Sequence, residues 1–367
     1  MGNSALVDES LAAACIEIEG DFEEVNSYFF EHGWSDGLPV VPPTQARVDA
    51  MIEASGRNRL DVLGRVAPSW GIATIEKVAI NATMAGCRPD YFPVVLAAVE
   101  AVMEEPFDLY GVQATTNPVA PMIVVNGPIS RSIGLNSGYN AFGQGWRANA
   151  TIGRALRLVL LNIGGGKPGV MDRATQGHPG KYSFCVAENE AETPWEPFHV
   201  EHGFSANADV VSVYGAAAFI NILDHTSRTA SGLLNMIGHS MTASGNNHPL
   251  FAGVALLALC PEHARILSAE GYSKADVRRE LFKHARVPRG HLSAECIELV
   301  RRMRPNQFID ESRDVDVLDR PEDLWIIVTG GGGPHSSFIP GYGSSVQPIM
   351  RQIGSKPPVY GTRLGAT

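Results

Sequence analysis

Three strongly apolar segments, each with the length of a β-strand, set the limits on what this chain can fold into. They are Met122–Val125, Phe251–Leu259 and Leu324–Val328. The first is followed by a long Gly-, Asn- and Ser-rich loop and the helix-like segment Ala150–Ile163, and the second by a helix-like segment that opens at Pro261 and runs through Ala269. Buried strands that alternate with helices are typical of α/β folds, in which sites form at the carboxyl ends of the strands. The sequence therefore predicts an α/β protein.

A chain of 367 residues exceeds the usual size of one domain, so we expect two coupled lobes. Each lobe should hold a mostly parallel sheet flanked by helices, because helical segments separate the strand-like runs. The expected division is an N-terminal lobe over residues 1–170, a connection over residues 171–208 and a C-terminal lobe over residues 209–367. This division places the most polar stretch of the chain at the junction of the lobes.

Two short similarities favour an internal duplication. Ile123–Val125 is followed by Asn-Gly and later by GYNAFG, while Ile326–Val328 is followed by Thr-Gly and later by GYGSS. Ala73–Ile75 and Ala150–Ile152 share the sequence Ala-Thr-Ile, and each opens a helix-like segment that ends in Gly. If the halves are related in this way, their Gly-rich loops should face a shared cleft.

Charge and hydropathy limit the class of partner. The formal net charge is −10 and the basic residues form no stripe, so the electrostatic footprint of a nucleic-acid binder is missing. No run reaches the roughly 18 apolar residues that a membrane span needs. The first 20 residues lack the basic start of a signal peptide. We expect a cytoplasmic protein that binds neither nucleic acid nor membrane.

Cysteine usage supports the same compartment. The five cysteines are odd in number and widely separated, and no two of them form a Cys-x-x-Cys pair. This pattern is typical of reduced thiols in the cytosol. We expect four of the five to be core residues: Cys15, Cys87, Cys260 and Cys296.

The residues that most strongly indicate an enzyme gather between Gly177 and Phe204, which we call the central stretch. Its 28 residues hold side chains that bind metals, move protons or act as nucleophiles: His178, Cys185, Glu188, Glu190, Glu192, Glu196, His199, Glu201 and His202. Six of the 11 histidines of the chain lie between residues 178 and 248. Since histidine titrates near neutral pH, this clustering predicts an active site.

Cys185 is the candidate nucleophile of the central stretch. A cysteine needs a nearby histidine or the positive end of a helix to form a thiolate. Glu188 or Glu196 would orient the histidine that serves as base. The alternative is that Cys185 is a buried, inert thiol, which is the usual state of cysteine. Three histidines of the stretch could activate it: His178, His199 and His202.

His199 and His202 form an H-x-x-H pair that could instead hold a divalent metal. Zinc or iron would need a third ligand from the stretch or from a distant histidine. The pair lacks the built-in base of an H-E-x-x-H motif. Acid–base chemistry, substrate contact and a structural role therefore remain open for both histidines.

The loop TGGGGPHSS after Val328 is a candidate cradle for an anionic group, because successive backbone amides can form an anion-binding nest. It lacks the Gly-Lys-Ser/Thr ending of an ATP-binding loop, and no G-x-G-x-x-G fingerprint for NAD or FAD is present. The expected substrate contacts come from this loop and from the central stretch: His178, Lys181, Gly331, Gly332, His335 and Ser336.

Three long motifs carry a resemblance to known proteins. At WSDGLPVVPPT, ANATIGRALRLVLLNIGGGKPG and GKYSFCVAENEAETPWEPFHVEHGF the chain resembles a family of uncharacterised bacterial proteins, over nearly its full length. PEHARILSAEGYSKADVRRELF and the last Gly-rich loop are similar to parts of proteins named for a UGSC motif. The UGSC motif itself is absent, so the resemblance implies neither a redox residue nor a reaction.

These patterns lead to three functional hypotheses. The first is a cytosolic lyase or hydrolase that acts on a C–N or C–S bond of a small anionic substrate through Cys185 and His199 or His202. The second is a metal-dependent enzyme with the H-x-x-H site. The third is a non-catalytic binding subunit of a larger complex, with its acids and histidines paired off. The apolar helices also favour a homo-oligomer.

Overall fold

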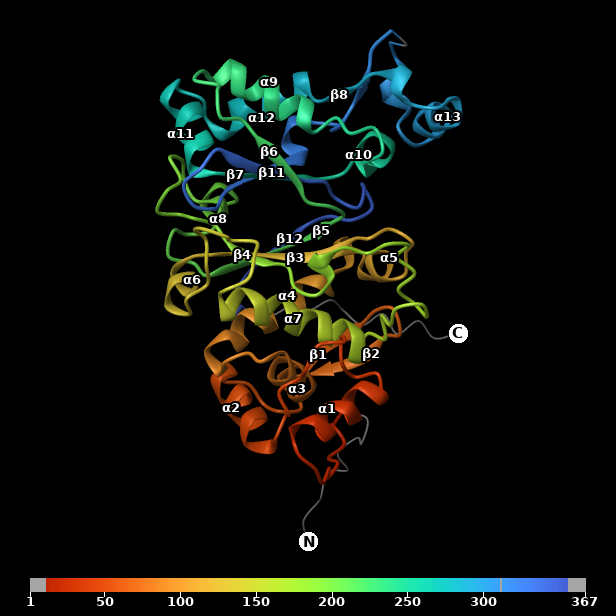
Figure 1. Ribbon diagram of the computed structural model, residues 1–367, viewed down its shortest axis with the longest axis vertical. Helices are drawn as coiled ribbons and strands as arrows, with labels where there is room; N and C mark the ends of the chain where they lie inside the picture. The colour runs from red at the N-terminus through yellow and green to blue at the C-terminus, as the bar shows by residue number, and fades with distance from the viewer. Residues whose placement is uncertain (1–10, 311, 356–367) are drawn as a thin grey trace.

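The computed structural model describes residues 11–310 and 312–355, and two stacked four-stranded sheets form its centre (Figure 1). Residues 1–10, on which part of the signal-peptide expectation rests, lie outside the described residues. Helices cover the outer face of each sheet, and the N-terminal helices add a further layer at one end. The longer helices are α1 (Phe22–Glu31), α2 (Gln45–Ser55), α3 (Ile75–Ala85), α4 (Phe92–Val102), α7 (Arg147–Asn162), α9 (Ala230–Ser240), α11 (Pro261–Ala269), α12 (Lys274–His284) and α13 (Ala294–Met303).

Short elements connect these layers. They are the hairpin strands β1 (Val62–Val66) and β2 (Gly71–Thr74), the strand pair β8 (Arg286–Val287) and β9 (Val315–Asp316), and the helices α5 (Leu109–Gln113), α6 (Pro128–Ser132), α8 (Phe198–Glu201) and α10 (Asn247–Phe251).

The first sheet has the strand order β12-β5-β3-β4. Its strands are β3 (Ala120–Asn126), β4 (Cys185–Ala187), β5 (Val210–Ala216) and β12 (Ile349–Gln352). β3 and β4 are parallel and are joined through α7, as expected for a helical crossover. β5 is antiparallel to both of its neighbours, β3 and β12.

The second sheet has the strand order β10-β7-β11-β6. Its strands are β6 (Ile220–Leu223), β7 (Ala255–Leu259), β10 (Leu324–Val328) and β11 (His335–Ile339). β7 and β10 are parallel, and α11 and α12 lie between them in the chain. β11 is antiparallel to β7 and to β6.

The α/β class is confirmed, but the expectation of mostly parallel sheets is wrong, because both sheets are mixed. Each sheet contains one parallel pair and two antiparallel pairs. The reason lies in the connections. Only six residues separate β10 from β11, which is too short for a helical crossover, so β11 returns in the opposite direction.

The two sheets have the same order of parallel and antiparallel strand pairs. Each sheet takes one edge strand from the chain segment that directly follows a strand of the other sheet. β6 follows β5 in the chain but pairs in the second sheet, and β12 follows β11 but pairs in the first. The two connections cross where Ala217 N–H donates to the Pro340 carbonyl at 2.9 Å and Tyr342 N–H donates to the Gly215 carbonyl at 3.1 Å. Sheet membership therefore does not follow the expected boundary at residue 209. The duplication stays a prediction.

Three apolar clusters occupy the spaces between the layers. Along β3, Ile123 and Val125 face α4 and α7, while Met122 and Val124 face the second sheet. This alternation is the period of two that a strand between two apolar layers requires. The third cluster lies between the second sheet and α9, α11 and α12.

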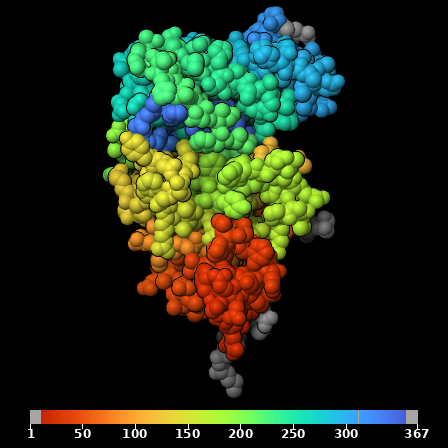
Figure 2. All heavy atoms as spheres, in the orientation of Figure 1, coloured from red at the N-terminus to blue at the C-terminus, as the bar shows by residue number. Residues whose placement is uncertain are grey.

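The N-terminal helices form one end of an elongated body (Figure 2). Asp21 and Glu24 make the capping box expected at the start of α1, and Thr74 caps α3 through its hydroxyl. Within residues 11–310 and 312–355, none of the helices combines the length and apolar character that crossing a membrane requires.

Candidate functional site

Cys185, the expected nucleophile, lies in the apolar core of the first sheet. It is 5% exposed and belongs to the same cluster as Ile123 and Val125. Burial raises the pKa of its thiol. Within the described part of the chain, the thiol makes no hydrogen bond to a histidine. The environment is that of an inert core thiol.

The two histidines of the H-x-x-H pair lie on α8 in different surroundings. His199 is fully buried, and its Nδ1 lies 3.8 Å from a carboxylate oxygen of Glu190. Neither ring nitrogen of His199 has a hydrogen-bond partner among the described residues. His202 is exposed, and its Nδ1 donates to the Phe198 carbonyl at 2.8 Å. No cluster of three or more His, Cys, Asp or Glu side chains in the described ranges has the arrangement of a metal site.

Glu188 and Glu196, the two acids expected to orient the histidine base, lie in different surroundings. The Glu188 carboxylate is buried and accepts hydrogen bonds from the Asn126 side chain at 2.7 Å and from the Phe198 amide at 2.6 Å. Burial raises the pKa of Glu188, against the opposing charge of Lys274, whose Nζ lies 3.9 Å away. Glu196 is exposed. The structure therefore brings neither acid to a histidine of the pair by a hydrogen bond.

An ion-pair network, which we call the lobe junction, joins α8 to α12. Lys274 is 4% exposed, lies 3.1 Å from the Glu201 carboxylate and donates to the Glu196 carbonyl at 3.1 Å. Arg278 lies 2.5 Å from the other oxygen of Glu201. Burial opposes the charged form of Glu201, but the two cations lower its pKa overall. Two acids of the central stretch, Glu188 and Glu201, thus face cations of α12.

His178 and Lys181 lie where the central stretch passes α7 and β5. His178 accepts the Gly180 amide at 3.1 Å through Nδ1 and lies 3.3 Å from the Ala216 carbonyl through Nε2. Lys181 donates to Asp172 at 2.6 Å. The cavity beside Lys181, which Arg157 also lines, measures 10 Å³, close to the space of one water molecule.

The Gly-rich loop after β10 is covered by Tyr139 from the N-terminal half. A Cβ atom built on Gly331 would lie 2.2 Å from the Tyr139 ring, so only glycine fits beneath it. The Gly330 amide donates to the Ser137 carbonyl at 2.8 Å, and the Gly333 amide donates to the Glu262 carboxylate at 3.0 Å. Two amides of the expected nest are therefore already satisfied by the protein.

A second thiol, Cys260, lies at the carboxyl edge of the second sheet, where β7 ends. Cys260 is the N-cap residue of α11, and its sulfur accepts the His263 backbone amide at 3.5 Å. Pro261 occupies the first helical position, where its missing N–H is no loss. The sequence Cys-Pro-x-His thus places a thiol at the positive end of a nine-residue helix, where the thiolate form is favoured.

Residues from two neighbouring strands lie beside the Cys260 thiol, because β6 ends and β11 begins at the same edge of the sheet. The Ser336 hydroxyl accepts the Cys260 amide at 3.1 Å and lies 3.6 Å from the Cys260 sulfur and 2.7 Å from His263 Nδ1. His263 Nε2 donates to the Asp224 carbonyl at 3.2 Å. We call these four residues the thiol site.

The thiol site is buried and electrostatically coupled. Cys260 is 2% exposed and His263 is 1% exposed. Burial disfavours both charged forms, yet the hydrogen bond and charge of His263 lower the pKa of Cys260, and the reciprocal contacts raise the pKa of His263. The two shifts together favour a thiolate–imidazolium pair. Such a pair can attack an electrophilic carbon and return a proton to a leaving group.

Of the residues expected from the sequence, only Ser336 belongs to the thiol site. His335, its neighbour, is exposed, and its Nδ1 lies 3.1 Å from the Asn221 side-chain oxygen. The expectation that Cys260 is a core residue describes its burial but misses its partners. The available signal was a cysteine directly after a core strand, followed by Pro at the helix start and by His three positions on.

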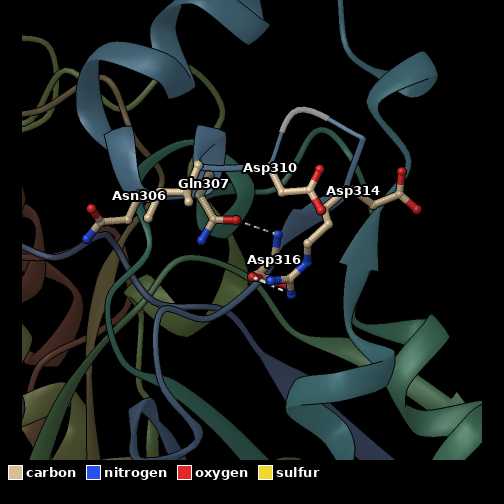
Figure 3. A pocket seen from close by; sticks show the side chains of 7 residues that line it. Asn306, Gln307, Asp310, Asp314 and Asp316 are labelled. Carbon is tan, nitrogen blue, oxygen red and sulfur yellow. Dashed lines mark hydrogen bonds and ion pairs between the residues drawn. The ribbon is translucent and has the colours of Figure 1, made fainter.

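A pocket of 140 Å³ lies on the segment between α13 and β9 (Figure 3). Asp310, Asp314 and Asp316 line it together with Arg313. Its lining contains no cysteine and no histidine, so it lacks a thiol nucleophile and an imidazole base.

In comparisons with known proteins, no protein-family model and no curated protein matches the chain. The resemblances read from the sequence motifs therefore stay expectations.

Proposed function

We propose that this protein is a thiol-dependent enzyme, a hydrolase or lyase that cleaves a C–N or C–S bond of a small molecule. Cys260 is the nucleophile and His263 is the acid–base group. The observation that carries the proposal is the position of the Cys260 thiol, at the start of α11 and in contact with Ser336, which hydrogen-bonds His263. The hypothesis that Cys185 is the nucleophile gains no support, because the Cys185 thiol is buried among apolar groups and its pKa is raised.

The proposed reaction follows from this pair. The Cys260 thiolate attacks the substrate carbon and forms an S–C bond, while the bond from that carbon to nitrogen or sulfur breaks. The His263 imidazolium gives its proton to the departing group. In a hydrolase, water then cleaves the S–C bond, its proton passes to the neutral imidazole, and the pair is restored. In a lyase, the neutral imidazole instead takes a proton from the neighbouring carbon, the S–C bond breaks as the double bond forms, and the thiolate and imidazolium are restored.

The substrate's anionic group is proposed to bind the amides of Gly331 and Gly332. Within residues 11–310 and 312–355, these two amides donate to no protein acceptor. They follow β10, which lies beside β7 in the sheet. Because Tyr139 lies against Gly331, this ring must move before an anion can reach the amides. A Tyr139→Ala variant should therefore lower the KM more than it changes kcat.

The thiol chemistry can be tested before the substrate is known. We expect iodoacetamide to label Cys260 at a lower pH than Cys296, which is half-buried and on α13. Peptide mass spectrometry over a pH series gives both midpoints. A Cys260→Ala variant should lose more than about a hundredfold of any C–N or C–S cleavage found in a substrate panel. Full activity in the Cys260→Ala variant would contradict the proposal. Cys87→Ala removes another buried thiol and is the matched control, which should keep its activity.

A second candidate, a non-catalytic binding subunit, is favoured by the paired charges of the central stretch. Glu201 and Lys274 are committed to the lobe junction, as that hypothesis expects. Affinity purification from the native cell at physiological salt distinguishes the two. A stoichiometric second chain, with no thiolate at Cys260, would favour the subunit. A homo-oligomer with a reactive Cys260 would favour the enzyme.

A further inference from the structure

We propose that Ser336 relays the proton between Cys260 and His263, so that its hydroxyl, and not direct contact alone, creates the thiolate. The inference deepens the proposed function and rests on it. It assigns Ser336 to the reacting groups instead of to substrate binding.

The hydrogen bonds around His263 determine the direction of the relay. The Asp224 carbonyl can only accept, so His263 Nε2, 3.2 Å away, carries a proton. In the neutral imidazole Nδ1 is then the acceptor. Ser336 Oγ, 2.7 Å from Nδ1, therefore donates to it in the neutral state. The basic nitrogen of His263 faces the serine hydroxyl.

The Ser336 hydroxyl is held in place by the nucleophile's own backbone. Its oxygen accepts the Cys260 amide at 3.1 Å and lies 3.6 Å from the Cys260 sulfur. A hydroxyl has one proton to give and two lone pairs to accept with. One lone pair takes the Cys260 amide. The O–H can donate to the Cys260 sulfur or, after rotation, to His263 Nδ1, and in the second orientation the other lone pair can accept the S–H proton.

Proton transfer through this arrangement is balanced. The Cys260 S–H proton passes to Ser336 Oγ as the Ser336 proton passes to His263 Nδ1, which leaves a thiolate and an imidazolium. The serine is neutral before and after, and it then donates to the thiolate and accepts from the imidazolium. Both charges stay hydrogen-bonded, which a buried ion pair requires.

Sheet geometry supplies a matched control. Ser336 and Phe338 are two residues apart on β11, and Phe338 belongs to the cluster beneath α9, α11 and α12. Ser337 lies on the opposite face with Ile339, between the two sheets. Both serines are buried, yet within the described ranges the Ser337 hydroxyl makes no hydrogen bond. Ser337→Ala therefore removes a buried hydroxyl from the same strand without touching the thiol site.

The test is the pH titration of the Cys260 thiolate, followed by its ultraviolet absorbance with a Cys260→Ser variant subtracted. We expect Ser336→Ala to raise the midpoint by about one pH unit, which lowers the ratio of thiolate to thiol about tenfold at any given pH. Ser336→Thr should restore the midpoint and Ser337→Ala should leave it unchanged. If Ser336→Ala does not fold, Ser336→Thr and Ser336→Val form an equal-shape pair with and without the hydroxyl.

The outcomes separate the two proposals. A low midpoint in the native protein that is unchanged in Ser336→Ala or Ser336→Val would overturn the relay and leave the thiol-dependent enzyme standing. An ordinary thiol midpoint in the native protein would overturn both. A midpoint that rises in Ser336→Ala and returns in Ser336→Thr would support the relay.

Discussion

His263 Nε2 lies 3.2 Å from the backbone carbonyl oxygen of Asp224, and this contact joins the end of β6 to the first turn of α11. The carboxylate of the same aspartate accepts the Thr226 amide at 3.0 Å and the Ser227 amide at 2.9 Å. The turn that presents the carbonyl is therefore held by its own side chain. The orientation of the imidazole depends on that turn.

Asp224→Asn should destabilise the protein in a pH-dependent way. Burial opposes ionisation, but hydrogen bonds from Ser227 and Thr226 lower the pKa of Asp224 from 3.8 to about 2. A folded pKa below the unfolded value means that the charge stabilises the fold above pH 3.8, and that this contribution is lost as the pH falls towards 2. We expect the variant to lose about 1–2 kcal/mol of unfolding free energy near neutral pH, measured by urea unfolding. Near pH 2 its unfolding free energy should equal that of the native protein. An equal loss at all pH values would contradict the account.

Cys185→Ser should cost stability without changing thiol reactivity. The serine hydroxyl would be buried among apolar side chains, so we expect a loss of about 2 kcal/mol, and Cys185→Ala should lose about 1 kcal/mol. Chemical denaturation measures both values. Thiolate absorbance should be the same as in the native protein. Its disappearance in either variant would return the nucleophile to the central stretch.

Lys274→Met should break the lobe junction. The substitution leaves Glu201 with a single cation and brings the buried Glu188 carboxylate next to an apolar side chain. Removing one partner of a buried charge network costs about 3–5 kcal/mol, which thermal and urea unfolding would detect. Lys283→Met removes an exposed cation from the same helix and is the control. Equal effects of the two variants would contradict a structural role for the network.

His199→Leu should be neutral or stabilising. Among residues 11–310 and 312–355, neither buried ring nitrogen of His199 has a hydrogen-bond partner, so removing them should recover up to about 1–2 kcal/mol. The unfolding free energy of this variant, compared with that of His202→Leu at the exposed position, tests the point. A loss larger than about 1 kcal/mol would contradict this expectation and mean that the His199 imidazole stabilises the fold, through Glu190 at 3.8 Å or through a bound water or ligand.

Local sequence signals identified most elements but not their arrangement. The core strands expected around Met122, Leu259 and Val328 are present as β3, β7 and β10, and the apolar helix expected at residues 150–163 is α7. Periodicity reports which residues are buried, but strand order depends on contacts between distant segments. The exchange of β6 and β12 between the sheets has no local signal, since each strand is short and pairs with a strand that is distant in the sequence.

Local sequence patterns do not locate the candidate site, for a related reason. The central stretch is rich in reactive groups, but folding pairs Glu201 with Lys274 and places Cys185 in the core. Cys260 and Ser336 are 76 residues apart, and only the pairing of β11 beside β7 brings them together. The density of reactive residues in the sequence therefore predicts an active site in the central stretch, whereas the thiol site lies at the edge of the second sheet.

The most direct test of the account is the thiolate titration of the native protein alongside Cys260→Ser and Cys185→Ser. The account predicts a thiolate signal with a midpoint below the ordinary cysteine value of about 8.5, lost in Cys260→Ser and kept in Cys185→Ser. A native midpoint at or above that value, or a signal lost in Cys185→Ser and kept in Cys260→Ser, would contradict it.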